Sequence, residues 1–556
     1  MRFFKQIQVL WWLHKKRIII AICVLVFVGI VARPLIIVWN RPLMPVNWLA
    51  RIENDTQRIL ERYLQRGSEF AHHDFNVNRQ NRVLSIALAN LEHHEFHWNG
   101  GRERLWEEDI MFFAHHVVAS HPLIINSPIW TSSFGRNPRF HMPPDVLHGL
   151  RRSFMFFHQD RELREAFFDE ISILIRQIPE LDDFAIAMNI SRIIAMLNDS
   201  HSQIVFSTAS GGDFLQGRLA VDFIHHYDEN WHEGAYPYSW PHATSAYIGI
   251  AEIINTRLLY INGVYIGDIF EMMRPYFPME IGVENSFRHI RSIEFIQRNV
   301  LRYFGVIKGN ETRVPLTVRD VNGYVFTVYS PFVRDMGDLP LATYQVDYDA
   351  LLYFARPDEN YWFKHFVDES MIYVRLFRCR EMLELSSTVF FRRVRDAIRF
   401  ADGVDTFILD LRNNRGGNFL IGKAELIAWA MVSENRELMG NIYVIVDNRS
   451  YSRGSLFALD WRYFVDDVTI IGTPTAGTLN VFADTITNFL PNSNLQFFIS
   501  TNASVHGEGW NPNSAVIPDI IVRRTLYDYM NNHDAVLEAI RVRAANHNAC
   551  FSSRED

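Results

Sequence analysis

The chain has 556 residues, of which 48% are hydrophobic and 21% charged, and its formal net charge is -8. This composition is typical of globular proteins. At roughly 150 residues per domain, the length predicts three or four folding units. No basic block or stripe of basic and aromatic residues stands out, which argues against a nucleic-acid partner. The three cysteines, Cys23, Cys379 and Cys550, have neither metal-ligand nor disulfide-framework spacing, so we expect no zinc finger and no disulfide scaffold.

A basic segment followed by a long apolar run opens the chain. Residues 1–17 hold five lysines and arginines, and the apolar run covers 18–39. A bilayer needs about 20 apolar residues, and flanking positive charges favour the cytoplasmic side. We therefore predict a cytoplasmic segment at 1–17, a single-pass signal anchor at 18–39 and an extracytoplasmic remainder tethered to the cell membrane. A cleaved signal peptide is the alternative, although Ile30 is bulky for the position three residues before the cut.

The rest of the chain changes its periodicity twice. Apolar residues recur at helical spacing across most of 47–210, which predicts a helical N-terminal domain. Short β-rich runs follow at 245–333, where Asn322-Gly323 between alternating apolar residues is typical of a hairpin turn. From 344 to 546, buried-strand runs alternate with helical runs, which predicts a largely parallel sheet covered by helices. The expected fold class is α/β with helical and β additions.

Three serines lie close together in "VDNRSYSRGSLFALDW", Val446 to Trp461. They fall where an apolar strand gives way to a helix that begins near Gly454. The free N–H groups and the positive dipole end of a helix N-terminus can stabilise an oxyanion, so a nucleophile fits here. Serine is also a favoured N-cap residue, so any of the three could simply start the helix.

A glycine pair marks the end of the preceding strand. "LDLRNNRGGN", Leu409 to Asn418, ends a buried strand in Asn-Asn-Arg-Gly-Gly. Glycines at such a place let the backbone approach a ligand and point an N–H group at it. The stretch is either a plain turn or, beside the serines at the same edge of the sheet, a second oxyanion donor.

Both stretches resemble the serine peptidase family that includes the C-terminal-processing (tail-specific) proteases and the tricorn protease core. "ILDLRNNRGG" is similar to the oxyanion strand of that family, and Ser452-Arg453-Gly454 is similar to the Ser-x-Gly of its tricorn branch. The resemblance implies a ClpP/crotonase-like core over 344–546 and a PDZ-like module at 245–333. It also implies Ser452 as nucleophile, with the backbone N–H groups of Gly417 and Arg453 as the oxyanion hole.

The identity of the base separates the two branches of this family. Tail-specific proteases use a lysine about two dozen residues after the serine, but no lysine follows Lys423, and the matching place holds Gly477 and Thr478. Arginine stays protonated and cannot replace it. "AMLNDSHSQIVF" instead resembles the tricorn segment that supplies a histidine after a serine, which implies His201 as general base and Ser200 as its orienting neighbour.

The remaining position of the family pattern is a glutamate shortly before the Pro-Asp of "VIPDI". Strict spacing places Pro512 there, and Glu508 is the nearest carboxylate, so Glu508 is the expected third residue. The histidines of "EHHEFHW" lack the HExxH spacing of a zinc helix, and we expect no metal or cofactor.

The resemblance predicts a serine-type endopeptidase that hydrolyses peptides or unfolded proteins through an acyl-enzyme. The alternative is a non-catalytic peptide- or lipid-binding protein on the same scaffold. The absent lysine and the displaced glutamate favour this alternative, whereas the joint presence of Ser200-His201 and Ser452-Arg453-Gly454 favours the peptidase.

Overall fold

The computed structural model describes residues 101–124, 161–206, 214–226, 240–280, 294–400, 403–417, 441–465, 467–505 and 514–552. The chain divides into a unit of residues 1–78 and a unit of residues 79–556, and everything described belongs to the second. The anchor predicted at 18–39 lies outside the described residues. Within the described part of the chain, no helix is both long and apolar enough to cross a membrane.

A six-stranded sheet forms the C-terminal part of the second unit, in the order β10-β11-β12-β13-β14-β17. The first strand pairs antiparallel with its neighbour, and all other pairs are parallel. This confirms the predicted largely parallel sheet. The strands are β10 (Tyr361–Phe366), β11 (Met371–Leu376), β12 (Thr406–Asp410), β13 (Asn441–Val446), β14 (Val468–Gly472) and β17 (Ile520–Ile521).

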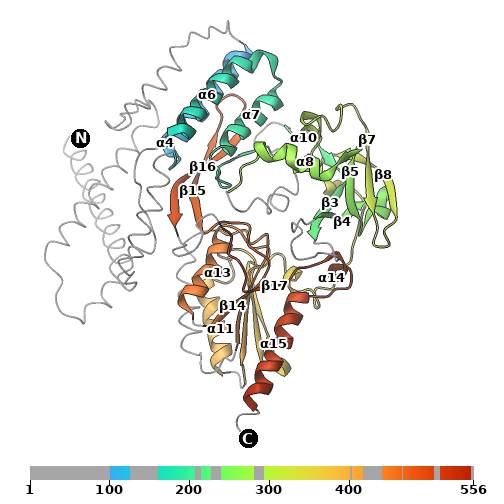
Figure 1. The fold of residues 1–556 in the computed structure, drawn as a ribbon, viewed down its shortest axis with the longest axis vertical. Coiled ribbons are helices and arrows are strands. Elements are labelled where there is room, and N and C mark those ends of the chain that lie inside the picture. The colour runs from blue at the N-terminus through green and yellow to red at the C-terminus, as the bar shows by residue number, and fades with distance from the viewer. Residues whose placement is uncertain are drawn as a thin grey trace, which may run out of the picture. The chain divides into compact units, whose positions relative to one another are not determined.

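Helices cover both faces of this sheet (Figure 1). The central strands are mostly apolar and buried on both sides, and successive side chains point to opposite faces. Ile372 and Val374 therefore pack with Phe390 of α11 (Ser387–Phe400) and Phe457 of α13 (Arg453–Phe464). The alternate residues of the strands pack against α15 (Ala535–Ser552). The short helix α14 (Leu526–Met530) precedes α15 and begins with a capping box at Thr525.

The helical segment contains α4 (Arg102–Ser120), α6 (Arg161–Gln177) and α7 (Asp183–Ala195). Asp182 caps α7 by accepting a hydrogen bond from the amide of Ala185. A hairpin of β15 (Asn480–Phe489) and β16 (Gln496–Val505) pairs with β1 (Gln203–Val205), and α4 packs on it. Residues 480–505, which were expected within the core at 344–546, thus form a sheet separate from the parallel one, and the sequence did not indicate this.

The β-rich segment forms a second large sheet in the order β2-β8-β7-β5-β4-β3. The hairpin predicted at Asn322-Gly323 is confirmed, because β7 and β8 pair antiparallel on either side of it. The PDZ-like assignment stays a prediction. The elements are β2 (Arg218–Leu219), β3 (Val221–His226), β4 (Trp240–Tyr247), β5 (Arg257–Ile261), β6 (Val264–Tyr265), β7 (Arg313–Arg319), β8 (Val325–Val333), β9 (Leu341–Thr343), α8 (Ile266–Met273) and α10 (Arg298–Tyr303).

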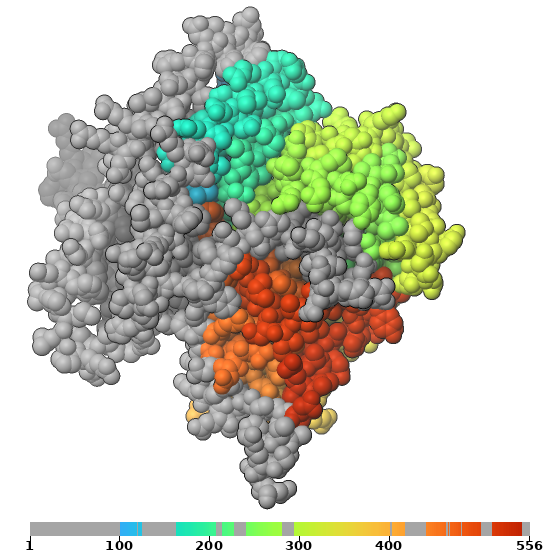
Figure 2. Space-filling model, in the orientation of Figure 1, coloured from blue at the N-terminus to red at the C-terminus, as the bar shows by residue number. Residues whose placement is uncertain are grey.

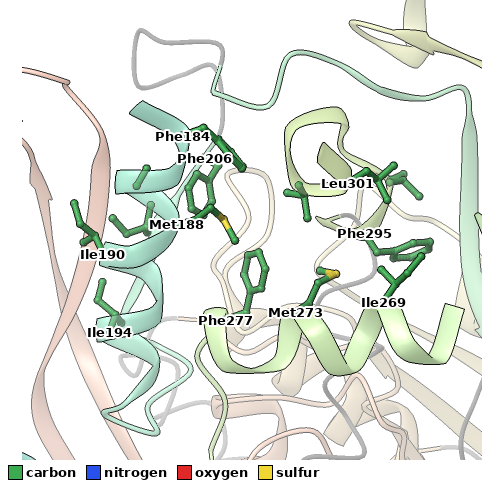
Figure 3. Packing of buried hydrophobic residues seen from close by; sticks show 14 of the residues in the cluster. Phe184, Met188, Ile190, Ile194, Phe206, Ile269, Met273, Phe277, Phe295 and Leu301 are labelled. Atoms are coloured by element: carbon green, nitrogen blue, oxygen red, sulfur yellow. The ribbon is translucent and has the colours of Figure 1, made fainter. Parts of the chain in front are cut away.

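The helical and β-rich segments share one hydrophobic core, and they adjoin on the face shown in Figure 2. Phe184 and Met188 on α7 point toward Met273 at the end of α8 and Phe277 just after it (Figure 3). All four side chains are buried. This packing fixes where the chain continues after each helix, and those two continuations lead to Ser200 and to Glu280.

Candidate active site

Ser452 stands at the junction between β13 and α13. Its backbone angles are φ 54° and ψ -128°, a strained combination for a residue with a side chain. It occupies the N-cap position of α13, yet its side chain makes no capping hydrogen bond. Among the three serines, the hydroxyls of Ser450 and Ser455 bond to backbone carbonyls at 2.8 Å. Helix capping therefore does not explain Ser452, and the strain at this position is typical of a functional residue.

The Ser452 hydroxyl faces His201. The distance from His201 Nε2 to Ser452 Oγ is 2.9 Å, although the two residues are 251 positions apart in the chain. His201 follows α7, and its backbone N–H donates to Asp199 Oδ1 at 2.9 Å. An imidazole within hydrogen-bonding distance of a hydroxyl can remove its proton when that oxygen attacks a carbon.

Tyr451 holds the opposite side of the imidazole. Its hydroxyl lies 2.9 Å from His201 Nδ1, and its ring stacks on the imidazole with 4.8 Å between the ring centroids. Only 14% of the His201 side chain is exposed. The ring is therefore fixed from two directions, with Nε2 toward Ser452 and Nδ1 toward Tyr451.

Two further side chains extend this contact into the protein. Ser200 Oγ donates to Glu280 Oε1 at 2.7 Å and lies 2.5 Å from the Tyr451 hydroxyl. Glu280 Oε2 accepts from the backbone N–H of Thr478 at 2.8 Å and from its hydroxyl at 3.1 Å. Both Glu280 and Ser200 are buried. Glu280 Oε1 is also 3.6 Å from His201 Nδ1.

Two buried carboxyl groups near His201 have pKa values shifted in opposite directions. Burial raises the pKa of Glu280, and the charge of His201 and the hydrogen bonds from Thr478 and Ser200 offset this only in part. Burial also opposes ionisation of Asp199, but the hydrogen bond from His121, with the charges of His121 and His201, brings its pKa below the usual value. Asp199 therefore ionises readily at neutral pH, whereas ionisation of Glu280 costs the folded state free energy.

This cost predicts that Glu280→Gln stabilises the fold while removing the carboxylate. Because the pKa of Glu280 is raised on folding, its ionised form destabilises the folded state as the pH rises above the ordinary value of 4.5. Thermal unfolding should show a higher melting temperature for Glu280→Gln at neutral pH, and the gain should vanish well below pH 4.5. A lower melting temperature at neutral pH would contradict this.

Glu381 offers a matched control, because its pKa is shifted in the opposite direction from that of Glu280. It also accepts hydrogen bonds from a serine hydroxyl and a backbone N–H, both from Ser387. Burial opposes its ionisation, but the Ser387 bonds lower its pKa below the ordinary value, so the ionised form favours the folded state. Glu381→Gln should lower the melting temperature at neutral pH, and this loss should disappear in acid.

Glycines allow the turn after β12 to approach Ser452 closely. A Cβ atom on Gly416 would lie 2.8 Å from Arg453 N and 2.8 Å from Ser452 Cβ. On Gly417 it would lie 2.2 Å from the carbonyl oxygen of Cys379, and on Gly454 2.2 Å from that of Asn414. The turn is held by Asn414, whose side-chain oxygen accepts from the N–H of Gly416 and whose carbonyl accepts from that of Tyr451. Only glycine fits where the two segments touch.

The close approach predicts a large effect of Gly416→Ala. The new methyl group would meet backbone and the Ser452 side chain at a φ of 87°, so Ser452 must move. Backbone strain of this kind costs about 1–3 kcal/mol, and displacing reacting atoms by about 1 Å can cost roughly 100-fold in rate. Gly323→Ala is the control, because Gly323 has φ 84° but nothing within 4 Å of its would-be Cβ. We expect chemical denaturation to show a lower free energy of unfolding for both variants. The rate at which a fluorophosphonate labels Ser452 should fall only in Gly416→Ala. Equal labelling of the two variants would contradict the close contact between Gly416 and Ser452.

The structure brings Ser452, His201 and Ser200 together, and places Gly417 and Arg453 on the two segments that meet beside Ser452. Glu508 lies outside the described residues. Gly477, one of the two residues that the resemblance aligned with the tail-specific lysine, lies close to Ser452, because a Cβ on it would be 3.2 Å from Ser452 N. Among the described residues, no group of three metal-ligating side chains is arranged to hold a metal ion.

The sequence did not indicate Glu280 or Tyr451. The available signal for Glu280 was an isolated acidic residue inside the apolar stretch "FPMEIG", Phe277 to Gly282. Tyr451 was visible only as the residue before Ser452. Their significance depends on the three-dimensional packing of segments that are far apart in the chain.

No protein-family model and no curated protein matches the chain. Solved structures to which it is similar include mature CPAF complexed with lactacystin, with 11% identity and a TM-score of 0.48 over 82% of this chain and 99% of that one. The photosystem II D1 C-terminal processing protease gives 12% identity and a TM-score of 0.33 over 75% and 92% of the two chains. The tricorn protease gives 14% and 0.31 over 70% and 35%. These neighbours are serine proteases of the family that includes the tail-specific proteases and the tricorn protease.

Proposed function

We propose that the protein is a serine peptidase in which Ser452 is the nucleophile and His201 the general base. The observation that carries this proposal is the 2.9 Å distance between His201 Nε2 and Ser452 Oγ. The strained backbone of Ser452 and the absence of a capping bond from its side chain support it.

The proposed reaction is acyl transfer. His201 Nε2 takes the proton of the Ser452 hydroxyl while Oγ attacks the peptide carbonyl carbon. The imidazolium returns this proton to the leaving amine as the C–N bond breaks, which leaves an ester on Ser452. A water then gives one proton to His201 as its oxygen attacks the ester. The imidazolium returns this proton to Ser452 Oγ as the C–O bond of the ester breaks, which releases the acid and restores the free hydroxyl. The proton transfers in these steps use Ser452, His201 and one water, and they require no metal or cofactor.

The negative oxygen of the tetrahedral intermediate needs hydrogen-bond donors. The backbone N–H groups of Gly417 and Arg453 are the proposed donors, since Gly416 brings the peptide joining it to Gly417 close to the first residue of α13. A helix N-terminus also presents positive potential to an anion. Losing one such donor costs roughly 3–4 kcal/mol of barrier in well-studied enzymes.

The proposed core fold is ClpP/crotonase-like, preceded by a PDZ-like module at 245–333. We also propose that residues 18–39 anchor the chain in the cell membrane with the catalytic part outside the cytoplasm, on the strength of their apolar length and the basic residues before them. Alkaline carbonate extraction of membranes tests the anchor. In a separate experiment, protease treatment of intact cells tests its orientation. Release of the protein by carbonate would contradict the anchor.

The test of the reaction is hydrolysis of an unfolded protein by the full-length chain. Appearance of new N-termini with time, abolished by a fluorophosphonate, is the expected result. Retention of the substrate without cleavage over a range of pH values would instead favour a non-catalytic peptide-binding protein on the same scaffold.

A further inference from the structure

A continuous line of hydrogen bonds runs from Ser452 to a buried carboxyl group. Ser452 contacts His201 Nε2 at 2.9 Å, and His201 Nδ1 contacts the Tyr451 hydroxyl at 2.9 Å. The Tyr451 hydroxyl contacts Ser200 Oγ at 2.5 Å, and Ser200 Oγ contacts Glu280 Oε1 at 2.7 Å. Each of the three members between Ser452 and Glu280 thus touches the one before and the one after.

Counting hydrogens gives this line a direction. An ionised carboxylate only accepts, so Ser200 gives its single hydroxyl hydrogen to Glu280. The Ser200 oxygen must then accept from the Tyr451 hydroxyl, which has no second hydrogen to give. The Tyr451 oxygen therefore accepts from His201, and Nδ1 must carry a hydrogen. In the neutral imidazole this leaves Nε2 as the acceptor that the Ser452 hydroxyl requires.

We propose that Glu280 is a positioning residue that sets the tautomer of His201 through Ser200 and Tyr451. The inference rests on the proposed function, because it explains how His201 is kept ready to act as a base. Glu280 does not touch the reacting atoms. It acts through the hydroxyl groups of Ser200 and Tyr451. Because the carboxylate accepts a hydrogen bond, each of these hydroxyls donates toward Glu280.

Several contacts hold Glu280 in this role. Its second oxygen is fixed by the N–H and hydroxyl of Thr478, so Oε1 remains for Ser200. The packing of α7 against the end of α8 and the short helix that follows it (Arg274–Tyr276) positions the segments that carry Ser200 and Glu280. Asp199 Oδ1 lies 3.8 Å from His201 Nδ1, but the hydrogen bonds of this carboxylate go to other groups, since Oδ1 accepts from the His201 backbone N–H and Oδ2 from His121 and Ser202.

The direction of the line suits both charge states of the histidine. The imidazolium formed during the reaction donates from both nitrogens, so Nδ1–H still donates to Tyr451. The Glu280 carboxylate, 3.6 Å from Nδ1, favours the positive charge on the ring. The ionised form of Glu280 thus supports His201 before and after proton transfer.

Protonation of Glu280 on Oε1 would reverse the line. Glu280 would donate to Ser200, Ser200 to Tyr451 and Tyr451 to Nδ1, which forces the neutral imidazole to carry its hydrogen on Nε2. That tautomer cannot accept the Ser452 proton. Among the described residues, the titratable groups facing Glu280 are His201 and Asp199 from the segment after α7 and Tyr451 before α13. The raised pKa of Glu280 brings this reversal nearer to neutral pH.

The test reads the tautomer directly in the full-length protein. Selective ¹⁵N-histidine labelling and solid-state NMR, assigned by subtracting the spectrum of His201→Ala, should show a hydrogen on Nδ1 of His201 near neutral pH. In Glu280→Gln, the amide can donate to Ser200, so the signal should shift to the Nε2–H form. The rate of fluorophosphonate labelling should fall by about 10²- to 10⁴-fold, the range contributed by a positioned base. Tyr451→Phe removes the connecting hydroxyl and should also lower the Nδ1–H population.

Matched controls leave the line intact. Glu381→Gln removes a carboxylate that accepts from Ser387, and Tyr443→Phe removes a hydroxyl bonded to Asn441 on β13. Neither should alter the tautomer or the pH profile of labelling. In Glu280→Gln, the fall of the labelling rate toward acid pH should no longer contain the step that titration of Glu280 causes. A variant with only a structural defect would instead label more slowly by the same factor at every pH.

The outcomes separate this inference from the proposed function. An active parent whose tautomer and pH profile are unchanged in both Glu280→Gln and Tyr451→Phe would overturn the role of Glu280 and leave the peptidase standing. An inert parent in which His201 still carries its hydrogen on Nδ1, and loses it in Glu280→Gln, would support the inference while refuting the peptidase. An Nε2–H form in the parent would overturn the inference.

Discussion

Replacing Ser452 by alanine should abolish hydrolysis. Removing the nucleophile of a serine enzyme lowers kcat by about 10⁶-fold, because no acyl-enzyme can form. The substitution should not harm the fold, since the Ser452 side chain caps no helix and alanine lacks only the hydroxyl that faces His201. Initial rates of peptide hydrolysis, measured beside thermal unfolding of the same samples, check both parts.

Ser455→Ala is the matched control for this experiment. Ser455 lies three residues further along α13, and its buried hydroxyl donates to the backbone carbonyl of Ser450. Its loss should cost about 1 kcal/mol of stability, the usual net value of one hydrogen bond, while the rate of hydrolysis stays close to that of the parent. Activity retained in Ser452→Ala but lost in Ser455→Ala would refute the assignment of the nucleophile.

Replacing His201 by alanine should lower the rate by at least about 10⁴-fold. Without the imidazole the Ser452 hydroxyl has no base at 2.9 Å, and general base catalysis contributes typically 10²- to 10⁴-fold before the return of the proton to the amine is counted. Labelling by a fluorophosphonate and hydrolysis should fall together, because both require the deprotonated oxygen.

Added imidazole gives this prediction a sharper form. The truncation leaves a space between Tyr451 and Ser452 that free imidazole fits, so His201→Ala should regain part of its activity in proportion to the imidazole concentration. Ser452→Ala should gain nothing under the same conditions. Equal responses of the two variants, or full activity of His201→Ala without imidazole, would show that His201 is not the base.

Much of the architecture could be predicted because it follows from periodicity. Residues 371–376, 406–410 and 441–446 are mostly apolar and buried along their whole length, as is typical of strands covered by helices on each side. The hairpin at Asn322-Gly323 follows from turn chemistry. The β15–β16 hairpin was not separable from the parallel sheet, since alternation predicts a strand but not the partner with which it pairs.

The residues of the candidate site were likewise only partly predictable from the sequence. Ser452, Gly417 and Arg453 lie within local motifs, and Ser200-His201 within another, so the resemblance could point to them. Glu280 lies in no motif, and Tyr451 lies in the serine stretch but was not singled out, because the role of both depends on contacts between residues 80 to 251 positions apart in the chain. Glu508 and the anchor at 18–39 remain predictions, as they lie outside the described residues.

The decisive measurement is the position of a fluorophosphonate adduct on the full-length protein. The labelled chain is digested and its peptides are sequenced by mass spectrometry. We predict one adduct, on the oxygen of Ser452, formed at a rate that follows the loss of peptide hydrolysis. An adduct on Ser450, Ser455 or any other residue, or hydrolysis that continues after Ser452 is fully labelled, would contradict Ser452 as the nucleophile.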